Sequence, residues 1–308
     1  MTMDDQEGFI WFDGKLVPWR EAKVHVLTHA LHYGTGVFEG VRVYKTDKGP
    51  AIFRLREHTD RLFRSARIIN MPMPYDKETL DEAQKQVVRE NNLASAYIRP
   101  MCFYGPEGIG LRANDLSVHV IVAAWKLEGS HFGAESLQRG LRVRTSSFSR
   151  HHVNAAMIKA KASGHYLNSM LAFQEAQACG YDEALMLDTT GFVVEGSGEN
   201  LFIVRNGELH TPDLSCVLEG ITRETIITVA RSAGIPVHER RITRDEVYTA
   251  DEAFFTGTAA EVVPIRALDD RVIGDDPPGP ITKMLQAAYF DYVHGRRSDH
   301  PEWLTMIA

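Results

Sequence analysis

The chain has 308 residues, of which 44% are hydrophobic, and a formal net charge of −7 at pH 7. This length allows one large domain or two of ordinary size. The acidic balance and the scattered arginines argue against a nucleic-acid-binding protein, and no apolar run approaches the ~18–20 residues of a membrane span. The polar first residues and three widely spaced cysteines predict a reduced, cytoplasmic protein without a signal peptide.

The first part of the chain alternates strand-like and helix-like segments. Turn residues separate short apolar runs, the helical segments carry apolar residues on one face, and the later strands are rich in β-branched and aromatic residues. The expected elements are hairpins over 9–19 and 40–55, helices over 56–70 and 76–92, and strands over 95–105 and 116–125.

A polar, glycine-containing stretch, "KLEGSHFGAES", follows the last of these strands and is interpreted as a linker. After it we expect a strand over 141–148, a helix over 161–179, short strands over 183–212, a helix over 222–234, strands around a glycine turn over 251–268, and a helix over 279–295. The pattern predicts an α+β protein with a small domain (1–125), an interdomain loop (126–136) and a large domain (137–308). A cleft between two domains is a common place for an active site.

Metal and nucleotide motifs are weak in this sequence. None of the thirteen histidines belongs to an H-E-x-x-H motif, and no zinc-like spacing of cysteines or acidic residues is present. The glycine-rich segment 32–42 lacks G-K-[ST] and runs into a strand-like segment. The sequence therefore predicts no metal site and no phosphate loop of the nucleotide-binding kind.

The segment "IKAKASGHY" (158–166) contains two lysines, Lys159 and Lys161. A lysine in a loop is usually a solvated charge, but a partly desolvated lysine can form a Schiff base with a carbonyl cofactor. Pyridoxal phosphate (PLP) would also need a carboxylate at its pyridine nitrogen and a group of phosphate-binding donors. Glu195 and Arg61 are candidates, as are the N–H-rich segments "EGITRET" and "TGTAAE". At this level either lysine remains possible.

Seven motifs occur in order along nearly the whole chain: "HALHYGTGVFEG", "HTDRLFRSA", "NNLASAYIRP", "KASGHYLNS", "EGSGENLF", "GITRETI" and "TGTAAE". With these motifs the chain resembles the bacterial branched-chain amino acid aminotransferases, which have the two-domain PLP fold type IV (D-amino acid aminotransferase-like), with the active site in the interdomain cleft. The resemblance implies PLP as cofactor.

The resemblance also distinguishes the lysines. The family's Schiff-base lysine stands in K-x-x-G-x-Y, which Lys161 fits through Gly164 and Tyr166 and which Lys159 does not. It implies that Lys161 also shuttles the proton, that Glu195 pairs with the pyridinium nitrogen, and that Tyr166 bonds the phenolic oxygen. The cofactor-binding residues implied in this way are Lys161, Arg61, Tyr166, Glu195, Ile221, Thr222 and Thr258.

Substrate contacts are implied for a second set of residues: Tyr33, Phe38, Gly40, Tyr97, Arg99, His131, Thr258 and Ala259. The aromatic side chains would form an apolar wall, and Arg99 would meet the second carboxylate of glutamate or 2-oxoglutarate. The linker departs from the family, because it lacks a second tryptophan and has His131 where a tyrosine is expected. Two interpretations stay open: a shift toward aromatic amino acids or amines, or a neutral loop change.

The implied reaction is PLP-dependent transamination of leucine, isoleucine and valine with 2-oxoglutarate. The alternatives are a fold type IV aminotransferase for D-amino acids or (R)-amines and, from another class, a non-catalytic binding protein. The expected partners are small-molecule amino acids and 2-oxo acids, with no nucleic acid and no membrane. The resemblance also implies at least a homodimer, in which a neighbouring subunit contributes near Tyr33, and a hexamer is the larger alternative.

Overall fold

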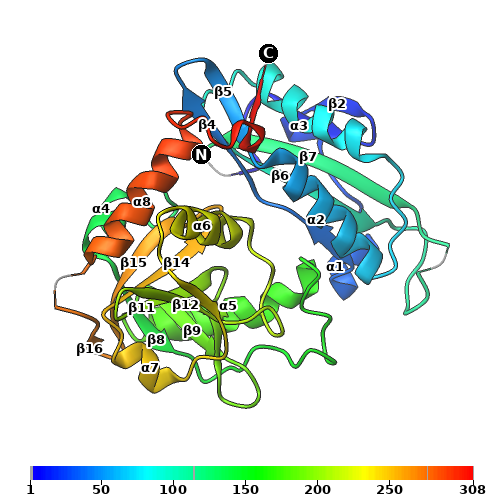
Figure 1. Ribbon diagram of the computed structural model, residues 1–308. Helices are drawn as coiled ribbons and strands as arrows, with labels where there is room; N and C mark the ends of the chain where they lie inside the picture. The colour runs from blue at the N-terminus through cyan, green and yellow to red at the C-terminus, as the bar shows by residue number, and fades with distance from the viewer. Residues whose placement is uncertain (1–2, 114, 276, 308) are drawn as a thin grey trace. The chain divides into compact units, whose positions relative to one another are not determined.

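The computed structural model describes residues 3–113, 115–275 and 277–307 (Figure 1). The chain forms two compact units. The first comprises Met1–Glu128, Ala160–His165 and Val293–Ala308, and the second comprises Gly129–Lys159 and Tyr166–Tyr292. The first boundary falls within the predicted loop 126–136, but two later segments return to the first unit, whereas all residues after 136 were expected in the large domain.

The first unit contains an antiparallel sheet of eight strands among the described residues. Its order is β17 (Leu304–Met306), β5 (Gly49–Phe53), β4 (Val41–Thr46), β6 (Ala96–Tyr104), β7 (Val118–Lys126), β1 (Phe9–Phe12) and β2 (Lys15–Pro18), with β3 (Gly36–Phe38) also pairing with β6. Helices α2 (Leu55–Ile68) and α3 (Lys77–Glu90) cover one face of this sheet (Figure 1). Their buried residues, including Leu62 and Val87, join strand residues in one hydrophobic core.

The predicted hairpins, helices and strands of this unit are confirmed to within about two residues at each end. The short helix α1 (His29–Tyr33) and the strand β17 were not predicted, because elements of five residues or fewer give little periodicity. β17 pairs with β5, which explains why the end of the chain belongs to the first unit.

The second unit contains a closed ring of six strands within the described part of the chain. The strands are β8 (Leu141–Thr145), β9 (Glu183–Leu187), β10 (Val193–Gly196), β11 (Asn200–Arg205), β14 (Glu252–Gly257) and β15 (Glu261–Leu268). Closure depends on the pairing of β10 with β11, whose register joins Glu195 to Asn200. Closure of the ring fixes the residues at its closing pair.

Three further strands extend the sheet of the second unit, and helices surround it (Figure 1). The strands are β12 (Glu208–Thr211), β13 (Val237–Glu239) and β16 (Arg271–Val272), and the helices are α4 (Ala134–Arg139), α5 (Tyr166–Ala178), α6 (Ile221–Ser232), α7 (Arg244–Tyr248) and α8 (Pro280–Val293). Apolar residues of α5, including Ala172 and Ala176, pack on Ala184 and Met186 of β9.

The helix predicted over 161–179 is wrong at its start, because α5 begins only at Tyr166, after a 3₁₀ turn at Ser163–His165. The backbone of Lys161 has other partners. Its N–H donates to Ser65 Oγ at 3.0 Å, and its carbonyl accepts from the N–H of Phe38 at 3.0 Å. Lys161 therefore lies in an extended segment bound to β3 and α2.

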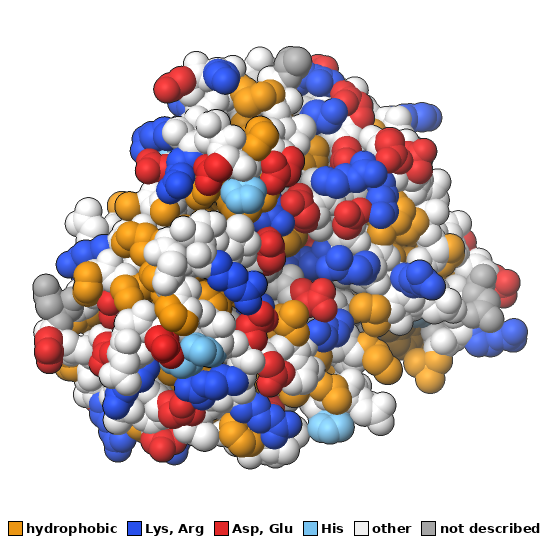
Figure 2. Space-filling model, in the orientation of Figure 1, with side chains coloured by type: hydrophobic (Ala, Val, Ile, Leu, Met, Phe, Trp, Pro, Cys, Tyr) orange, Lys and Arg blue, Asp and Glu red, His pale blue; other side chains and the backbone are white. Residues whose placement is uncertain are grey.

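Charged side chains of both signs are interspersed over the visible surface (Figure 2). Across the described residues, no helix is long and apolar enough to span a membrane. Within the same part of the chain, no three potential metal-ligating side chains lie grouped together.

Candidate active site

The segment carrying Lys161 is fixed against β3 in the first unit. Ala162 forms a β-bridge with Val37, and the N–H of Gly164 donates to the carbonyl of Gly34 at 3.2 Å. A Cβ added to Gly34 would lie 2.8 Å from the Cα of Gly164, so this close approach requires glycine there. The lysine backbone is thus held in place by several contacts on both sides.

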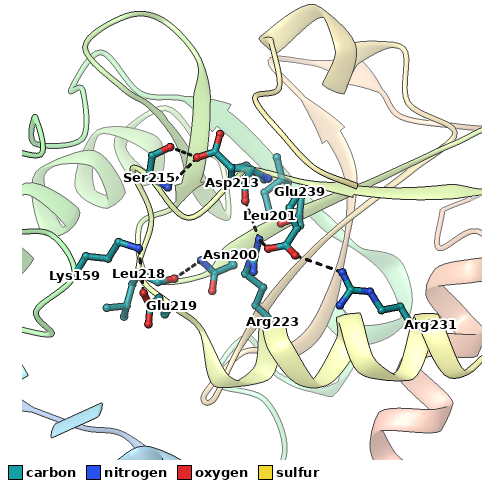
Figure 3. Close-up of polar contacts among 12 residues, drawn as sticks. Lys159, Asn200, Leu201, Asp213, Ser215, Leu218, Glu219, Arg223, Arg231 and Glu239 are labelled. Carbon is teal, nitrogen blue, oxygen red and sulfur yellow. Dashed lines mark hydrogen bonds and ion pairs between the residues drawn. The ribbon is translucent and has the colours of Figure 1, made fainter. Parts of the chain in front are cut away.

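The two lysines of the segment have different surroundings. Lys161 Nζ lies 5.2 Å from the centroid of the Phe38 ring in the first unit. Lys159 belongs to the second unit, where its Nζ forms a 3.1 Å ion pair with Glu219 Oε1 (Figure 3). Both partners of this pair are more than a third exposed, as for an ordinary surface charge pair.

Arg61 is buried in the first unit, on the same face of α2 as the buried His58 and Ser65. Its Nε donates to Glu39 Oε1 at 2.6 Å and its Nη2 to Glu39 Oε2 at 2.9 Å. Ser65, which accepts from the Lys161 N–H, lies one helical turn further along α2. One helix therefore positions both Arg61 and the backbone of Lys161.

Four predicted substrate-binding residues come together on the sheet of the first unit. The Arg99 guanidinium lies 4.6 Å from the Phe38 ring centroid and donates to Tyr97 Oη at 3.4 Å. A Cβ on Gly40 would lie 1.7 Å from Tyr97 Oη, so any larger residue there would have to displace the Tyr97 side chain. One surface is thus formed by the aromatic rings of Phe38 and Tyr97, the backbone of Gly40 and the guanidinium of Arg99.

Tyr33 lies in a different part of the first unit, at the end of α1. Its hydroxyl accepts from the N–H of Gly110 at 3.1 Å. The ring borders a cavity of about 1060 Å³ that Gly164 and His165 also line.

Glu195 is buried in the second unit, and both of its carboxylate oxygens have partners. Oε1 forms a 2.8 Å ion pair with Nε of the buried Arg150. Oε2 accepts from the Leu218 N–H at 3.3 Å and from Asn200 Nδ2 at 3.4 Å. The carboxylate is therefore held in one orientation at the closing pair of the strand ring.

The first turn of α6 lies next to Asn200 and Leu218, which donate hydrogen bonds to the Glu195 carboxylate (Figure 3). The helix begins at Ile221 after Gly220, which has no side chain to cap the first N–H groups. A Cβ on Gly220 would lie 1.9 Å from Asn200 Oδ1, so the glycine also permits the close packing of Asn200. The N–H groups near Ile221 and Thr222 form the positive end of a twelve-residue helix, where an anion can bind.

The predicted interdomain loop is tied to the turn between β14 and β15, which contains Thr258 and Ala259. The His131 N–H donates to the Ala259 carbonyl at 3.0 Å, and Ser130 Oγ donates to the Ala260 carbonyl at 3.0 Å. His131 Nε2 lies 3.7 Å from Glu199 Oε1. These residues form a second group within the second unit, and Tyr166 stands half-buried at the start of α5.

Several buried polar residues beside these groups were missed from the sequence, including Glu39, His58, Arg150 and Glu183. Burial, together with the charge of Glu199, raises the pKa of Glu183 to about 8. The spacing of His58, Arg61 and Ser65 along α2 places them on one helix face, and this signal was available in the sequence. No comparable local pattern connects Arg150 to Glu195, because these residues meet only through the folding of the strand ring.

Comparisons with known proteins show the family to which this chain is related. The family model described as "Amino-transferase class IV" matches residues 36–268. A relative from Pseudomonas aeruginosa, named branched-chain-amino-acid aminotransferase, is 61% identical over 307 residues and 100% of both chains. A relative of the same name from Escherichia coli K12 is 46% identical over 97% of each chain.

Solved structures show the same fold. A branched-chain amino acid aminotransferase of T.th., solved with pyridoxamine 5'-phosphate, has a TM-score of 0.95 and 48% identity, covering 98% of this chain and 99% of that one. The enzyme of Escherichia coli has a TM-score of 0.96 and 45% identity, covering 98% and 100%. The predicted resemblance and the predicted α+β, fold type IV class are confirmed, and the chain belongs to the class IV aminotransferases.

Proposed function

We propose that this aminotransferase transfers the amino group between branched-chain L-amino acids (leucine, isoleucine and valine) and 2-oxoglutarate, with pyridoxal 5'-phosphate as its cofactor. The family and the names of the full-length relatives support this substrate class. The observation that carries it in the structure is the aromatic surface of Phe38 and Tyr97 with the Arg99 guanidinium beside it. Such a surface can accept an aliphatic side chain and also a second carboxylate.

The residues present fit this cofactor. The first unit supplies the Lys161 amine and the Arg61 guanidinium, and the second supplies the Glu195 carboxylate and the uncapped first turn of α6. When bound, the cofactor supplies an electron sink for the carbanion formed at the substrate α-carbon. The protein then has to orient the reacting groups and move one proton.

Lys161 is the residue proposed to bind the cofactor covalently and to move that proton. Its Nζ would act as the general base for the α-proton of the substrate and, once protonated, as the general acid that returns this proton. The backbone hydrogen bonds of Lys161 with Phe38 and Ser65 hold the base in position, as does the β-bridge between the next residue, Ala162, and Val37. Lys159, which is paired with Glu219, has no proposed role in the chemistry.

Glu195 is proposed to hold the proton on the pyridine nitrogen. The ion pair with Arg150 and the two hydrogen bonds to Oε2 fix its orientation, so that the carboxylate is preorganised. Tyr166 is proposed to donate a hydrogen bond to the phenolic oxygen.

The phosphate is proposed to bind Arg61, the N–H groups of Ile221 and Thr222, and the turn at Thr258. Charge-assisted hydrogen bonds to a guanidinium and to a helix N-terminus are the usual means of holding a phosphate. Ala259 and His131 are proposed to border the substrate from the second unit and Gly40 from the first, and Tyr33 is proposed to border the substrate of a neighbouring subunit.

A substrate panel tests the reaction. With 2-oxoglutarate as acceptor, L-leucine, L-isoleucine and L-valine should each give kcat/KM values at least about 10-fold above those of D-alanine and of an (R)-amine. A preference for D-alanine or the (R)-amine would favour another fold type IV specificity. A colourless purified protein without PLP and without activity would favour a non-catalytic binding protein.

We further propose that the enzyme is at least a homodimer and is cytoplasmic. The first unit exposes a group of large apolar side chains around α1 and in the loop between β6 and β7: Val26, Leu27, Leu31, Tyr33, Ile109 and Leu111. Leu111 is 92% exposed, although His29 and Tyr33 hold the adjacent Gly110 in place. An ordered apolar surface of this kind is typical of a protein interface, and a second copy is proposed to cover it. Three free cysteines agree with a reducing compartment.

Light scattering after size-exclusion chromatography tests the assembly. The wild-type chain should elute as a dimer or larger, and Leu111→Asp should shift it toward the 34.6 kDa monomer. A monomeric wild-type protein would contradict the proposed interface.

A further inference from the structure

Glu39, His58 and Arg61 form a buried polar cluster in the first unit, with exposed fractions of 0%, 1% and 4%. Glu39 accepts from Arg61 at 2.6 and 2.9 Å and from His58 Nδ1 at 2.7 Å. Glu39 follows β3, whereas His58 and Arg61 are three residues apart on α2. The cluster therefore fixes the plane of the guanidinium proposed to bind phosphate.

The cluster contains one full negative and one full positive charge. Burial alone would raise the pKa of the Glu39 carboxyl, but the Arg61 charge and the hydrogen bonds from Arg61 and His58 hold this pKa well below its usual range. Burial lowers the pKa of His58. The hydrogen bond and charge of Glu39 partly offset this shift, whereas the charges of Arg61 and Lys161 lower the pKa further. His58 is therefore neutral at pH 7 and donates its Nδ1 proton to the ionised Glu39.

A buried guanidinium needs a counterion, because an unpaired buried charge costs several kcal/mol. With phosphate bound, Arg61 has an anion to pair with. Without phosphate, Glu39 is the carboxylate that neutralises it. Glu39 and the phosphate therefore share the Arg61 guanidinium as their cation. The negative charge of each one reduces the net electrostatic attraction between Arg61 and the other.

We propose that Glu39 is the resident counterion of Arg61, a positioning residue that keeps the phosphate site formed in the cofactor-free protein and weakens phosphate binding as a consequence. This inference rests on the proposed role of Arg61. It differs from two other roles for Glu39. A clamp between β3 and α2 would affect the free and the loaded protein equally, and a residue that only aims Arg61 would strengthen phosphate binding.

The test is Glu39→Gln, which removes the charge and keeps the shape. In the cofactor-free full-length chain this change should lower the melting temperature by at least about 5 °C, and the loss should be at least halved with PLP bound. The PLP dissociation constant should fall about 10-fold, while that of pyridoxal, which lacks the phosphate, should stay within about 2-fold. Millimolar inorganic phosphate should raise the melting temperature of this variant more than that of the wild type.

The matched control is Glu57→Gln. Glu57 pairs with Arg54, another buried arginine next to the same helix, outside the proposed phosphate site. This variant should show equal losses with and without PLP, and an unchanged PLP dissociation constant.

The Arg61→Gln variant separates the inference from the proposed function. If it binds PLP as tightly as the wild type, the phosphate role of Arg61 and this inference both fail. If it loses affinity for PLP but not for pyridoxal, while Glu39→Gln leaves the PLP dissociation constant unchanged or raises it, only the inference fails. If Glu39→Gln folds only with PLP present, the double variant Glu39→Gln/Arg61→Gln should fold without it, and failure of that rescue would overturn the inference.

Discussion

Each unit buries an arginine–carboxylate pair among its candidate site residues. The proposed functional residue is the arginine in the first pair and the carboxylate in the second. In the first unit Arg61 is proposed to bind the phosphate, and Glu39 neutralises it. In the second unit Glu195 is proposed to bind the pyridine nitrogen, and Arg150 neutralises it. The shared arrangement shows that a functional charge and its buried counterion have to be supplied together, because either one alone would be costly in the protein interior.

The supports of the two pairs also differ. Glu39 accepts from two side chains of α2, His58 and Arg61, and from the neighbouring Gly40 N–H, so its position depends on α2. Glu195 has a backbone donor, Leu218, and stands at the closing pair of the strand ring. Changes to the Glu195 group are therefore expected to affect the stability of the second unit as well as the chemistry.

The largest expected effect follows removal of the counterion in the second unit. Arg150→Met should lower the free energy of unfolding by about 3–5 kcal/mol, because Glu195 is left buried and unpaired. Arg142→Met, at an exposed pair with Asp270, should leave it nearly unchanged. Denaturant unfolding measures both. If the double variant Arg150→Met/Glu195→Gln is no more stable than Arg150→Met, the pairing is not the source of the loss.

The next effect tests the functional end of the same pair. Glu195→Gln should lower kcat/KM about 10²–10³-fold, because it removes a preorganised charge at the proposed pyridinium nitrogen. Steady-state kinetics would measure the loss, and the nitrogen resonance of ¹⁵N-labelled PLP should move toward that of the unprotonated ring. Glu208→Gln on the surface of the same unit is the control. Activity within about 3-fold of the wild type would contradict the role.

A third effect concerns pH and the buried Glu183 of the second unit. Its folded pKa, about 8, lies above the ordinary glutamate value of 4.5, so the folded state keeps a proton that the unfolded state releases between these values. Wild-type stability should therefore fall as pH rises from about 5 to 8, with a contribution of up to about 1.4 kcal/mol per pH unit from this group. Glu183→Gln should remove that slope in urea unfolding at pH 5, 6.5 and 8. Parallel wild-type and variant profiles would refute it.

The smallest effect tests the aromatic surface of the first unit. Phe38→Leu should raise the KM for 2-oxoglutarate about 2- to 10-fold, because the ring no longer holds the Arg99 guanidinium by a cation–π contact. The KM for L-leucine should change less, since the leucine side chain introduced at position 38 still provides an apolar wall. Phe9→Leu, at an exposed ring of the same unit, should leave both constants unchanged. Equal rises for both substrates would argue against this role of Phe38.

Much of the fold could be predicted from the sequence, because the longer helices and strands have clear periodicity and turn residues. The closed ring of six strands could not, because it also requires the pairings of β8 with β15 and of β11 with β14, which join strands far apart in the sequence. Similarly, the helix predicted from the sequence begins at 161, whereas α5 begins at Tyr166. The backbone contacts of Lys161 with Ser65 and Phe38 override the local helical propensity there.

Most of the candidate site residues came from ordered motifs, and the structure groups several of them within each unit. The supporting residues were missed for two physical reasons. Glu39 and His58 look like ordinary polar residues until burial makes their charges matter, and Arg150 meets Glu195 only in the folded second unit. For His131, the structure adds its hydrogen bond to Ala259 and its proximity to Glu199.

The central claim is that Lys161, and not Lys159, binds the cofactor. Borohydride reduction of the purified holoenzyme, followed by proteolysis and mass spectrometry, should find the phosphopyridoxyl group on Lys161. Lys161→Ala should lose the absorbance of the bound cofactor above 400 nm together with about 10⁴-fold in turnover, whereas Lys159→Ala should keep both. A label on Lys159, or retention of the absorbance in Lys161→Ala, would contradict the account.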